Sequence, residues 1–205
     1  LVNGVDVNDN LFGNANNLFI EDAVEEVQIL TSGISAEYGR FSGGVVNAIT
    51  KRGGNAFSGS FRVDFTNPSW RDENPREESR GTERTDTTNK SYQATLGGPI
   101  VKDKLWFFLA GRTEDLTRNA TMVGTAIPYT STNANDRFEA KLTATISQNH
   151  TLQGSYLNNK TEQAGPSLES YAADPATFYD PPRTLPNNLF VVSYNGVLSS
   201  NLVAE

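Results

Sequence analysis

The chain has 205 residues, of which 37% are hydrophobic and 20% are charged, and its formal net charge is -7. An acidic chain lacks the cationic surface that nucleic-acid binding requires, and the absence of cysteine excludes disulfides and thiolate metal sites. No apolar run approaches the roughly 20 residues of a transmembrane helix, so a helical membrane protein is excluded, whereas the lipid-facing residues of a β-barrel recur only at every second position.

The two ends of the sequence predict that it is a piece of a longer protein. It begins Leu-Val-Asn-Gly, without a start Met or a signal segment, and it stops at Glu205 within an alternating pattern. We therefore draw no conclusion about cellular location from the missing signal segment.

Residues 1–55 are rich in Asn and Gly and predict a small mixed α/β unit. Asn16 or Asn17 could cap a brief helix that extends through Glu26. Two short apolar runs are suited to strands, at residues 27–30 and 45–49.

From Phe57 onward, apolar and polar residues alternate, which is typical of strands with two different faces. In the first such stretch, Phe61 and Phe65 fall on one face while Arg62 and Asp64 fall on the other. Comparable stretches predict about six strands, at residues 57–66, 91–96, 105–114, 138–147, 151–159 and 189–198.

The connections between these predicted strands alternate in length. Short turns are expected at 97–104 and 147–150, and long polar loops at 67–87, 115–136 and 160–186. Connections in compact soluble domains are mostly about 4 to 6 residues long, whereas outer-membrane barrels carry short turns at one end and long loops at the other. The alternation in length therefore favours a transmembrane barrel.

A soluble β-sandwich with long loops is the alternative, because the same alternation would then separate a dry core from water. The polar faces carry charged residues such as Glu139 and Lys141, which suit either a wet lumen or bulk solvent. These faces alone do not distinguish the two architectures.

Within residues 25–51, several residue types occur in a fixed order. The order comprises a Tyr-Gly pair, a Gly-Gly pair, and then an apolar strand with Asn and Thr-Lys: Tyr38, Gly39, Gly43, Gly44, Asn47, Thr50 and Lys51. It resembles the closing motif of the plug domain in TonB-dependent receptors. Paired glycines permit positive φ and close backbone approach, as required where a plug strand reverses beneath a barrel wall. Together with the flanking segments 3–10 and 53–59, the motif looks most like the Oar-like branch of that family.

The resemblance implies a mainly β fold, namely a partial transmembrane antiparallel β-barrel preceded by the C-terminal part of an α/β plug domain. Residues 1–55 would be that part of the plug, and residues 56–205 the first about six strands, with long external loops, of a barrel of about 22 strands. The seven motif residues would then be a structural plug signature, and no residue is assigned to ligand binding.

The resemblance also implies a receptor in the bacterial outer membrane that binds an external ligand and imports it through the plugged barrel. Its implied partners are outer-membrane lipid, an external ligand of unknown type, and the inner-membrane TonB energy-coupling protein, which would contact a segment outside these residues. The alternative is an outer-membrane adhesion or surface-assembly protein that uses the same plug-barrel frame without importing a solute.

The sequence offers little for catalysis or metal binding. Residues 6–10 begin like a calcium loop, yet Leu11 stands where the turn Gly belongs and Asn17 where the bidentate Glu belongs. His150 is the single histidine, so neither a His-based triad nor a multi-His metal site can be built. We therefore expect no enzyme activity, no cofactor and no metal.

Overall fold

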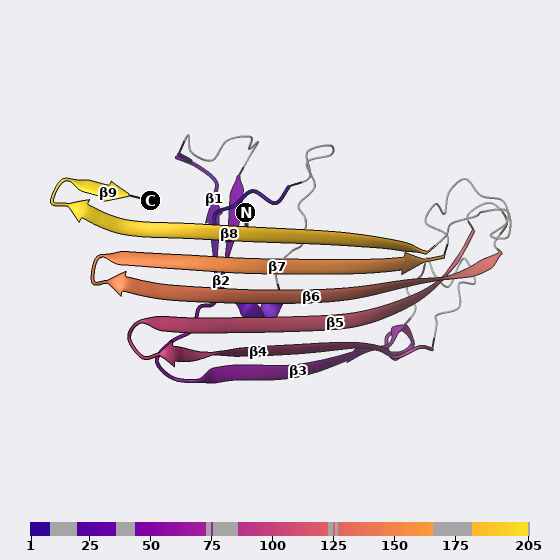
Figure 1. Cartoon of the computed structure of the whole chain (residues 1–205). Helices are drawn as coiled ribbons and strands as arrows, with labels where there is room; N and C mark the ends of the chain where they lie inside the picture. The colour runs from indigo at the N-terminus through magenta and orange to yellow at the C-terminus, as the bar shows by residue number, and fades with distance from the viewer. Residues whose placement is uncertain are drawn as a thin grey trace.

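The computed structural model describes residues 1–8, 20–35, 44–72, 75, 86–122, 125, 127–165 and 182–204. These residues form two antiparallel sheets (Figure 1). The small sheet consists of β1 (Val24–Leu30) and β2 (Val45–Thr50). The large sheet has seven strands, β3 (Ser58–Thr66), β4 (Asn89–Val101), β5 (Leu105–Thr121), β6 (Pro128–Ser147), β7 (His150–Ala164), β8 (Arg183–Ser199) and β9 (Leu202–Ala204). Single 3₁₀ turns occur at η1 (Glu21–Ala23) and η2 (Pro68–Trp70).

The chain is therefore mainly β and antiparallel, as predicted. Each strand of the large sheet pairs with the next one along the chain. The tight turns after β4, β6 and β8 lie at one end of the sheet, and the last residues of β3, β5 and β7 lie at the other (Figure 1). Nowhere in the described ranges is a helix both long and apolar enough to cross a membrane.

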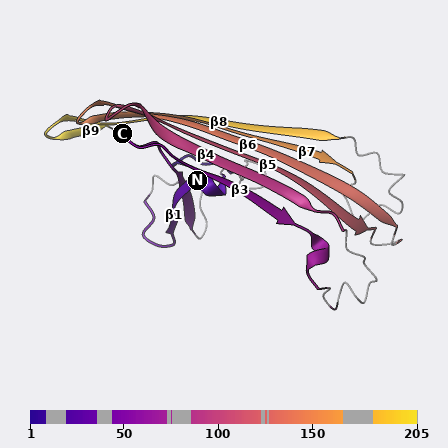
Figure 2. The same cartoon turned by 90° about the horizontal axis from the view of Figure 1, so that it is seen from below.

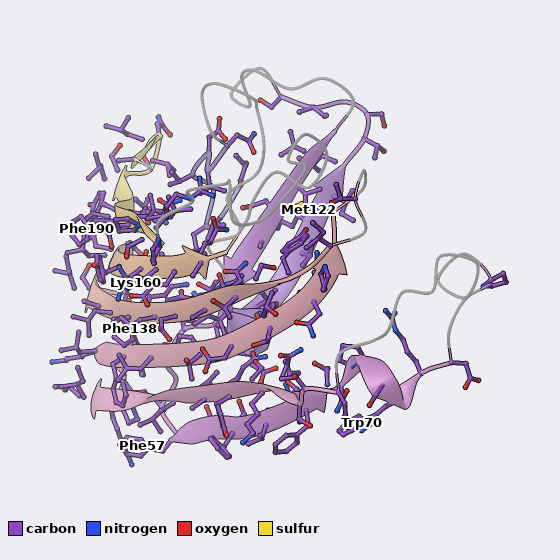
Figure 3. All side chains as sticks on the ribbon, turned by 90° about the vertical axis from the view of Figure 1, so that its right-hand side faces the viewer. Phe57, Trp70, Met122, Phe138, Lys160 and Phe190 are labelled. Atoms are coloured by element: carbon purple, nitrogen blue, oxygen red, sulfur yellow. The ribbon has the colours of Figure 1, made fainter. Side chains whose placement is uncertain are left out.

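The two faces of the large sheet differ in chemistry. Along the pairing register, Phe61 lies opposite Ala94, Ala94 opposite Gly111, and Gly111 opposite Phe138, so apolar residues of neighbouring strands share a face. That face is exposed, and Figure 3 shows Phe57, Phe138 and Phe190 on it. The predicted alternation is confirmed.

The small sheet lies against the other, polar face of the large sheet, and its strands run across those of the large sheet (Figures 1 and 2). Two small apolar clusters join the segments that flank the small sheet to the large sheet. One contains Val2, Val7 and Leu157, with Leu189 packed against it, and the other contains Ile20, Ala23, Phe108 and Ala110. The core of the described structure therefore lies between the sheets.

Several strands extend further than predicted, and the prediction of a long loop at 115–136 is wrong. β5 and β6 stay paired as far as Thr121 and Pro128, which leaves only residues 122–127 between them. Polar side chains support this pairing, because the Thr130 hydroxyl donates to Asn119 Oδ1 at 2.8 Å. The strands continue because Thr and Asn side chains on neighbouring strands form hydrogen bonds to each other across the sheet.

The helix expected through Glu26 is also wrong at its C-terminal end. Only a single 3₁₀ turn is present at Glu21–Ala23, and β1 begins at Val24, which pairs with Thr50 of β2. Pairing with β2 satisfies the backbone there and overrides the local helical preference. Asn16 and Asn17 lie outside the described residues, whereas the strands expected at 27–30 and 45–49 are confirmed.

Candidate functional site

The candidate site is the contact between the small sheet and the polar face of the large sheet, and Thr50 lies at its centre. Thr50 is the last residue of β2 and is 2% exposed. Its hydroxyl donates to Glu139 Oε1 and accepts from Lys141 Nζ, both at 2.5 Å. Lys141 also donates to the Thr50 carbonyl oxygen at 2.8 Å. One residue of the small sheet thus bonds two charged side chains of β6.

Strand geometry explains why Glu139 and Lys141 point to the same place. Residues two apart on a strand share a face, so both side chains leave β6 opposite to Phe138 and Leu142. The side chains are 1% and 2% exposed, and Lys141 Nζ lies 3.8 Å from Glu139 Oε1. Buried charges are costly unless they are paired and hydrogen-bonded, so the large sheet depends on Thr50 to stabilise this pair.

Asn3 ties the start of the chain into the same network. Its Oδ1 accepts from the Thr50 backbone N–H at 3.0 Å and from Lys141 Nζ at 3.4 Å, and its Nδ2 donates to Thr50 Oγ1 at 3.1 Å. The side chains of Asn3, Thr50, Lys141 and Glu139 form one continuous polar cluster, termed the latch below.

A second set of charged contacts holds η1. Arg112 of β5 donates to both carboxylate oxygens of Glu21 at 2.7 and 2.8 Å, and to Glu114 at 3.0 Å. Arg62 of β3 pairs with Asp22 at 2.9 Å. The acidic start of η1 therefore lies against arginines from two strands of the large sheet. These contacts are more exposed than the latch and are screened more strongly by water and salt.

Three of the four described signature residues have clear structural contacts. Asn47 is 8% exposed, accepts from the Gly4 backbone N–H at 3.0 Å and donates to Gln28 at 3.4 Å. Thr50 belongs to the latch, and Lys51 donates through its ammonium to the Asp22 carbonyl oxygen at 2.8 Å.

A side chain at Gly44 would place its Cβ 3.1 Å from the Leu30 carbonyl oxygen, so glycine permits the close approach of β1 and β2. Tyr38, Gly39 and Gly43 lie outside the described residues. The role of the seven residues as a plug signature stays a prediction.

The segment after β2 is fixed to the large sheet by contacts that sequence reasoning missed. Asn55 Oδ1 accepts from the Asp103 backbone N–H at 2.9 Å and from Trp106 Nε1 at 2.8 Å. A Cβ at Gly53 would collide with the Phe107 carbonyl oxygen. The signal that could have found this segment is the Gly-Gly-Asn run directly before the first alternating strand.

Glu139, Lys141 and Arg112 were also missed as contact residues. The sequence signal that could have identified them is the occurrence of charged residues at alternate positions of strands whose other face is apolar. In the ranges described above, no group of three or more His, Cys, Asp or Glu side chains is arranged to hold a metal ion.

Comparisons with known proteins found a curated relative and a similar solved structure. No protein-family model matches the chain. Over 123 residues, 58% of this chain, it is 42% identical to the TonB-dependent transporter Oar of Myxococcus xanthus, of which it covers 11%. The crystal structure of the outer membrane transporter YddB from Escherichia coli matches 95% of this chain with a TM-score of 0.61.

The identity to YddB is 19%, so that likeness shows the fold alone, and the chain covers 28% of YddB. The chain thus spans a small part of both proteins. The predicted resemblance to TonB-dependent receptors, and to their Oar-like branch, is confirmed.

Proposed function

We propose that this chain is part of a TonB-dependent transporter of the bacterial outer membrane, which binds an external ligand and imports it through a plugged barrel. In this proposal, residues 1–55 are the C-terminal part of the plug, and residues 56–205 are the first strands of the barrel wall. The plug would close the lumen through the latch and through the contacts of η1.

The observation that carries the proposal is the difference in polarity between the two faces of the large sheet. One face of the large sheet is polar and holds the small sheet, whereas the other is apolar and exposed. A water-soluble sandwich would instead pack the small sheet against the apolar face. The arrangement supports a wall with a stopper on its lumen side and lipid on its outer side.

The height of the apolar belt supports the same orientation. On β6, the outward side chains from Phe138 to Ile146 are apolar, over about 27 Å at about 3.4 Å per residue. With the strand tilt of about 35–45° found in outer-membrane barrels, this length spans about 20 Å along the bilayer normal, which is most of their roughly 25 Å apolar band. Beyond it, outward positions such as Thr132 and Asp136 are polar, so this end of the strands would stand outside the bilayer.

The proposed partners follow from this placement. Outer-membrane lipid contacts the apolar belt, the external ligand approaches from the end with the long connections, and TonB contacts a segment outside residues 1–205. The similar proteins are transporters, which supports a transport role over an enzymatic one. The ligand type is not assigned.

Growth assays with the full-length gene test the proposal. A deletion strain would carry either the complete gene or the gene without its energy-coupling segment, and would receive iron chelates, oligosaccharides or peptides one at a time as the limiting nutrient. Transport predicts growth on at least one nutrient with the complete gene only. Equal growth of the two strains on every nutrient would contradict import. Cell contact that is impaired in the deletion strain without either gene, and restored by both genes, would then favour the adhesion alternative.

A further inference from the structure

A cavity of about 340 Å³ lies where the segment after β2 meets the large sheet. Its walls come from that segment and from three neighbouring strands, β5, β6 and β7: Arg52, Gly53, Gly54, Asn55, Trp106, Thr143, Thr145 and Thr151. Thr145 and Thr151 flank the tight turn between β6 and β7, so the cavity lies near the end of the sheet that carries the tight turns. Its volume is within the range of about 300 to 1,000 Å³ that is usual for small-molecule sites.

Three threonines present hydroxyl groups to this cavity. Thr143 and Thr145 lie two residues apart on β6 and therefore share a face, and Thr151 lies opposite Thr145 on β7. Thr143 is 5% exposed, and its hydroxyl oxygen is buried without a hydrogen-bond partner in the described part of the chain. Nearly all buried polar groups in folded proteins have a partner, so this hydroxyl indicates that something polar occupies the cavity.

The charge on the cavity wall is positive. Arg52 lines the cavity, and its guanidinium forms no ion pair within the described residues. No carboxylate of a described residue lines this cavity. Glu25 and Glu26 instead line a separate cavity of about 250 Å³, which Arg52 also borders. An anion in the first cavity would therefore meet a cation without facing a carboxylate on the described wall.

Glycine and tryptophan shape the remaining walls. A Cβ at Gly53 would collide with the Phe107 carbonyl oxygen, so glycine is needed for this segment to approach β5 so closely. A Cβ at Gly54 would meet no atom of the described residues within 4 Å, so the chain next to it is uncovered. The Trp106 indole N–H already donates to Asn55 Oδ1 at 2.8 Å, and the ring therefore offers an apolar surface.

This set of groups is suited to a phosphate. Arginine guanidinium and threonine hydroxyl groups are among those that contact phosphate oxygens in proteins. A carboxylate has two oxygens in one plane, whereas a tetrahedral phosphate directs its oxygens to several sides, as donors on different walls require. The cavity is larger than a phosphate group alone, and the Trp106 ring borders the space that is left. A small organic substituent on the phosphate therefore fits as well.

We propose that this cavity binds the phosphate group of a small phosphate ester, which contacts Arg52 and the hydroxyl of Thr143. The binding does not depend on which solute is imported; the proposed transport function only places this end of the sheet in the periplasm. Two sources share the chemistry, namely a soluble phosphate ester of the periplasm and the headgroup of a phospholipid in the inner leaflet of the outer membrane.

Binding measurements on the full-length protein in detergent test the site and distinguish its sources. Radiolabelled glycerol 3-phosphate, measured by equilibrium dialysis, represents the soluble source. Phosphatidylglycerol, measured by native mass spectrometry, represents the lipid source. Glycerol and diacylglycerol lack the phosphate and are the matched control probes. We expect saturable binding of at least one phosphate probe and of neither control probe.

Two substitutions in the cavity are compared with two outside it. Arg52→Gln removes the charge and Thr143→Val the buried hydroxyl, and each should weaken binding about tenfold, as expected for a lost hydrogen bond to a charged group. Lys102→Gln removes an exposed cation near the same end of the sheet, and Thr130→Val a hydroxyl near the other end of β6. Each of these controls should change binding by less than about twofold, because exposed polar contacts contribute little.

The stability of Thr143→Val separates binding from a structural role. Without ligand, its thermal unfolding should match that of the parent, because the hydroxyl has no described partner to lose. The phosphate probe that binds more tightly identifies the source. Absence of saturable binding for both phosphate probes would overturn the site, as would an affinity that Arg52→Gln and Thr143→Val leave unchanged. Equal binding of a phosphate probe and its control would also overturn it.

Discussion

At the scale of single residues, the same chemical pair has two different roles in this chain. Lys141 and Glu139 lie two residues apart on β6, and Lys160 and Glu162 two apart on β7. The first pair is buried beneath the small sheet, whereas the side chains of the second are 44% and 52% exposed. Burial, and not the residue types, decides which pair holds the structure together.

Thr50→Val tests the central residue of the latch. Valine keeps the shape of threonine but removes the hydroxyl that bonds both Glu139 and Lys141. We expect a loss of about 1 to 3 kcal/mol of unfolding free energy, since buried charged groups lose a partner. Thermal unfolding of the full-length protein in detergent measures it. Thr130→Val is the control, because the Thr130 hydroxyl bonds Asn119 at an exposed site, and an equal loss there would contradict the account.

Asp86 gives a prediction for pH. Hydrogen bonds from Asn67 and Ser69, at 2.8 and 3.1 Å, hold the pKa of its carboxyl below the ordinary value, against a smaller opposing effect of burial. A lowered pKa in the folded state means that the contact contributes fully above the ordinary pKa of Asp, about 3.9, and is lost as pH falls through the lowered value.

The fluorescence of Trp70, isolated by subtracting the signal of Trp70→Phe, reports this loss because Trp70 follows Ser69 in η2. The transition should lie below about pH 3.9 and should be absent in Asp86→Asn. A transition above that pH, or one that persists in Asp86→Asn, would contradict the assignment.

At the scale of strands, the faces could be predicted from sequence but the ends could not. Alternation is local, so Phe61 and Arg62 already place their strand on a two-faced sheet. Strand ends depend on pairing, and the Thr- and Asn-rich stretch after Glu114 reads as a loop until its partner strand lies beside it.

The same reason limits prediction of the site. Thr50 and Asn47 stand in a recognisable motif, whereas Arg112 and Lys141 become contact residues only because a second sheet lies opposite them. No local pattern encodes which residue of a distant segment meets them. The small sheet and the large sheet had to be docked before the latch could be seen.

Outward positions on β6 should respond to charge according to their height. Leu142→Arg places a charge within the apolar belt and should cost about 2 to 4 kcal/mol, whereas Thr132→Arg, above the belt on the same face, should cost about 0 to 1 kcal/mol. The unfolding free energy of each variant is measured by urea titration of the full-length protein folded in lipid vesicles. Equal costs would contradict the boundary between belt and headgroup region.

At the scale of the whole molecule, the sheet is not self-sufficient in water. Its exposed face carries large apolar side chains, among them Phe61 at 72% and Phe190 at 72% exposure. Contiguous apolar patches of this kind are covered by a partner or by lipid in working proteins. The strands at the two sides of the sheet, β3 and β9, each pair on one side only within the described residues.

The 205-residue chain produced alone should therefore aggregate in water and stay dispersed in detergent. Size-exclusion chromatography with light scattering distinguishes the two states. A monodisperse, folded monomer without detergent would instead support a soluble sandwich.

Spin-label accessibility along β6 tests the central claim, that one face of the large sheet meets lipid while the other holds the small sheet. Labels at each position from 128 to 147 would be placed in the full-length protein in bilayers. We predict that oxygen, which partitions into lipid, relaxes labels at 138, 140, 142, 144 and 146. Labels at 139, 141 and 143 should be shielded from both reagents. A water-soluble nickel reagent should reach labels at the even positions between 128 and 136, beyond the apolar belt. Access of the nickel reagent to positions 138–146 would contradict the account.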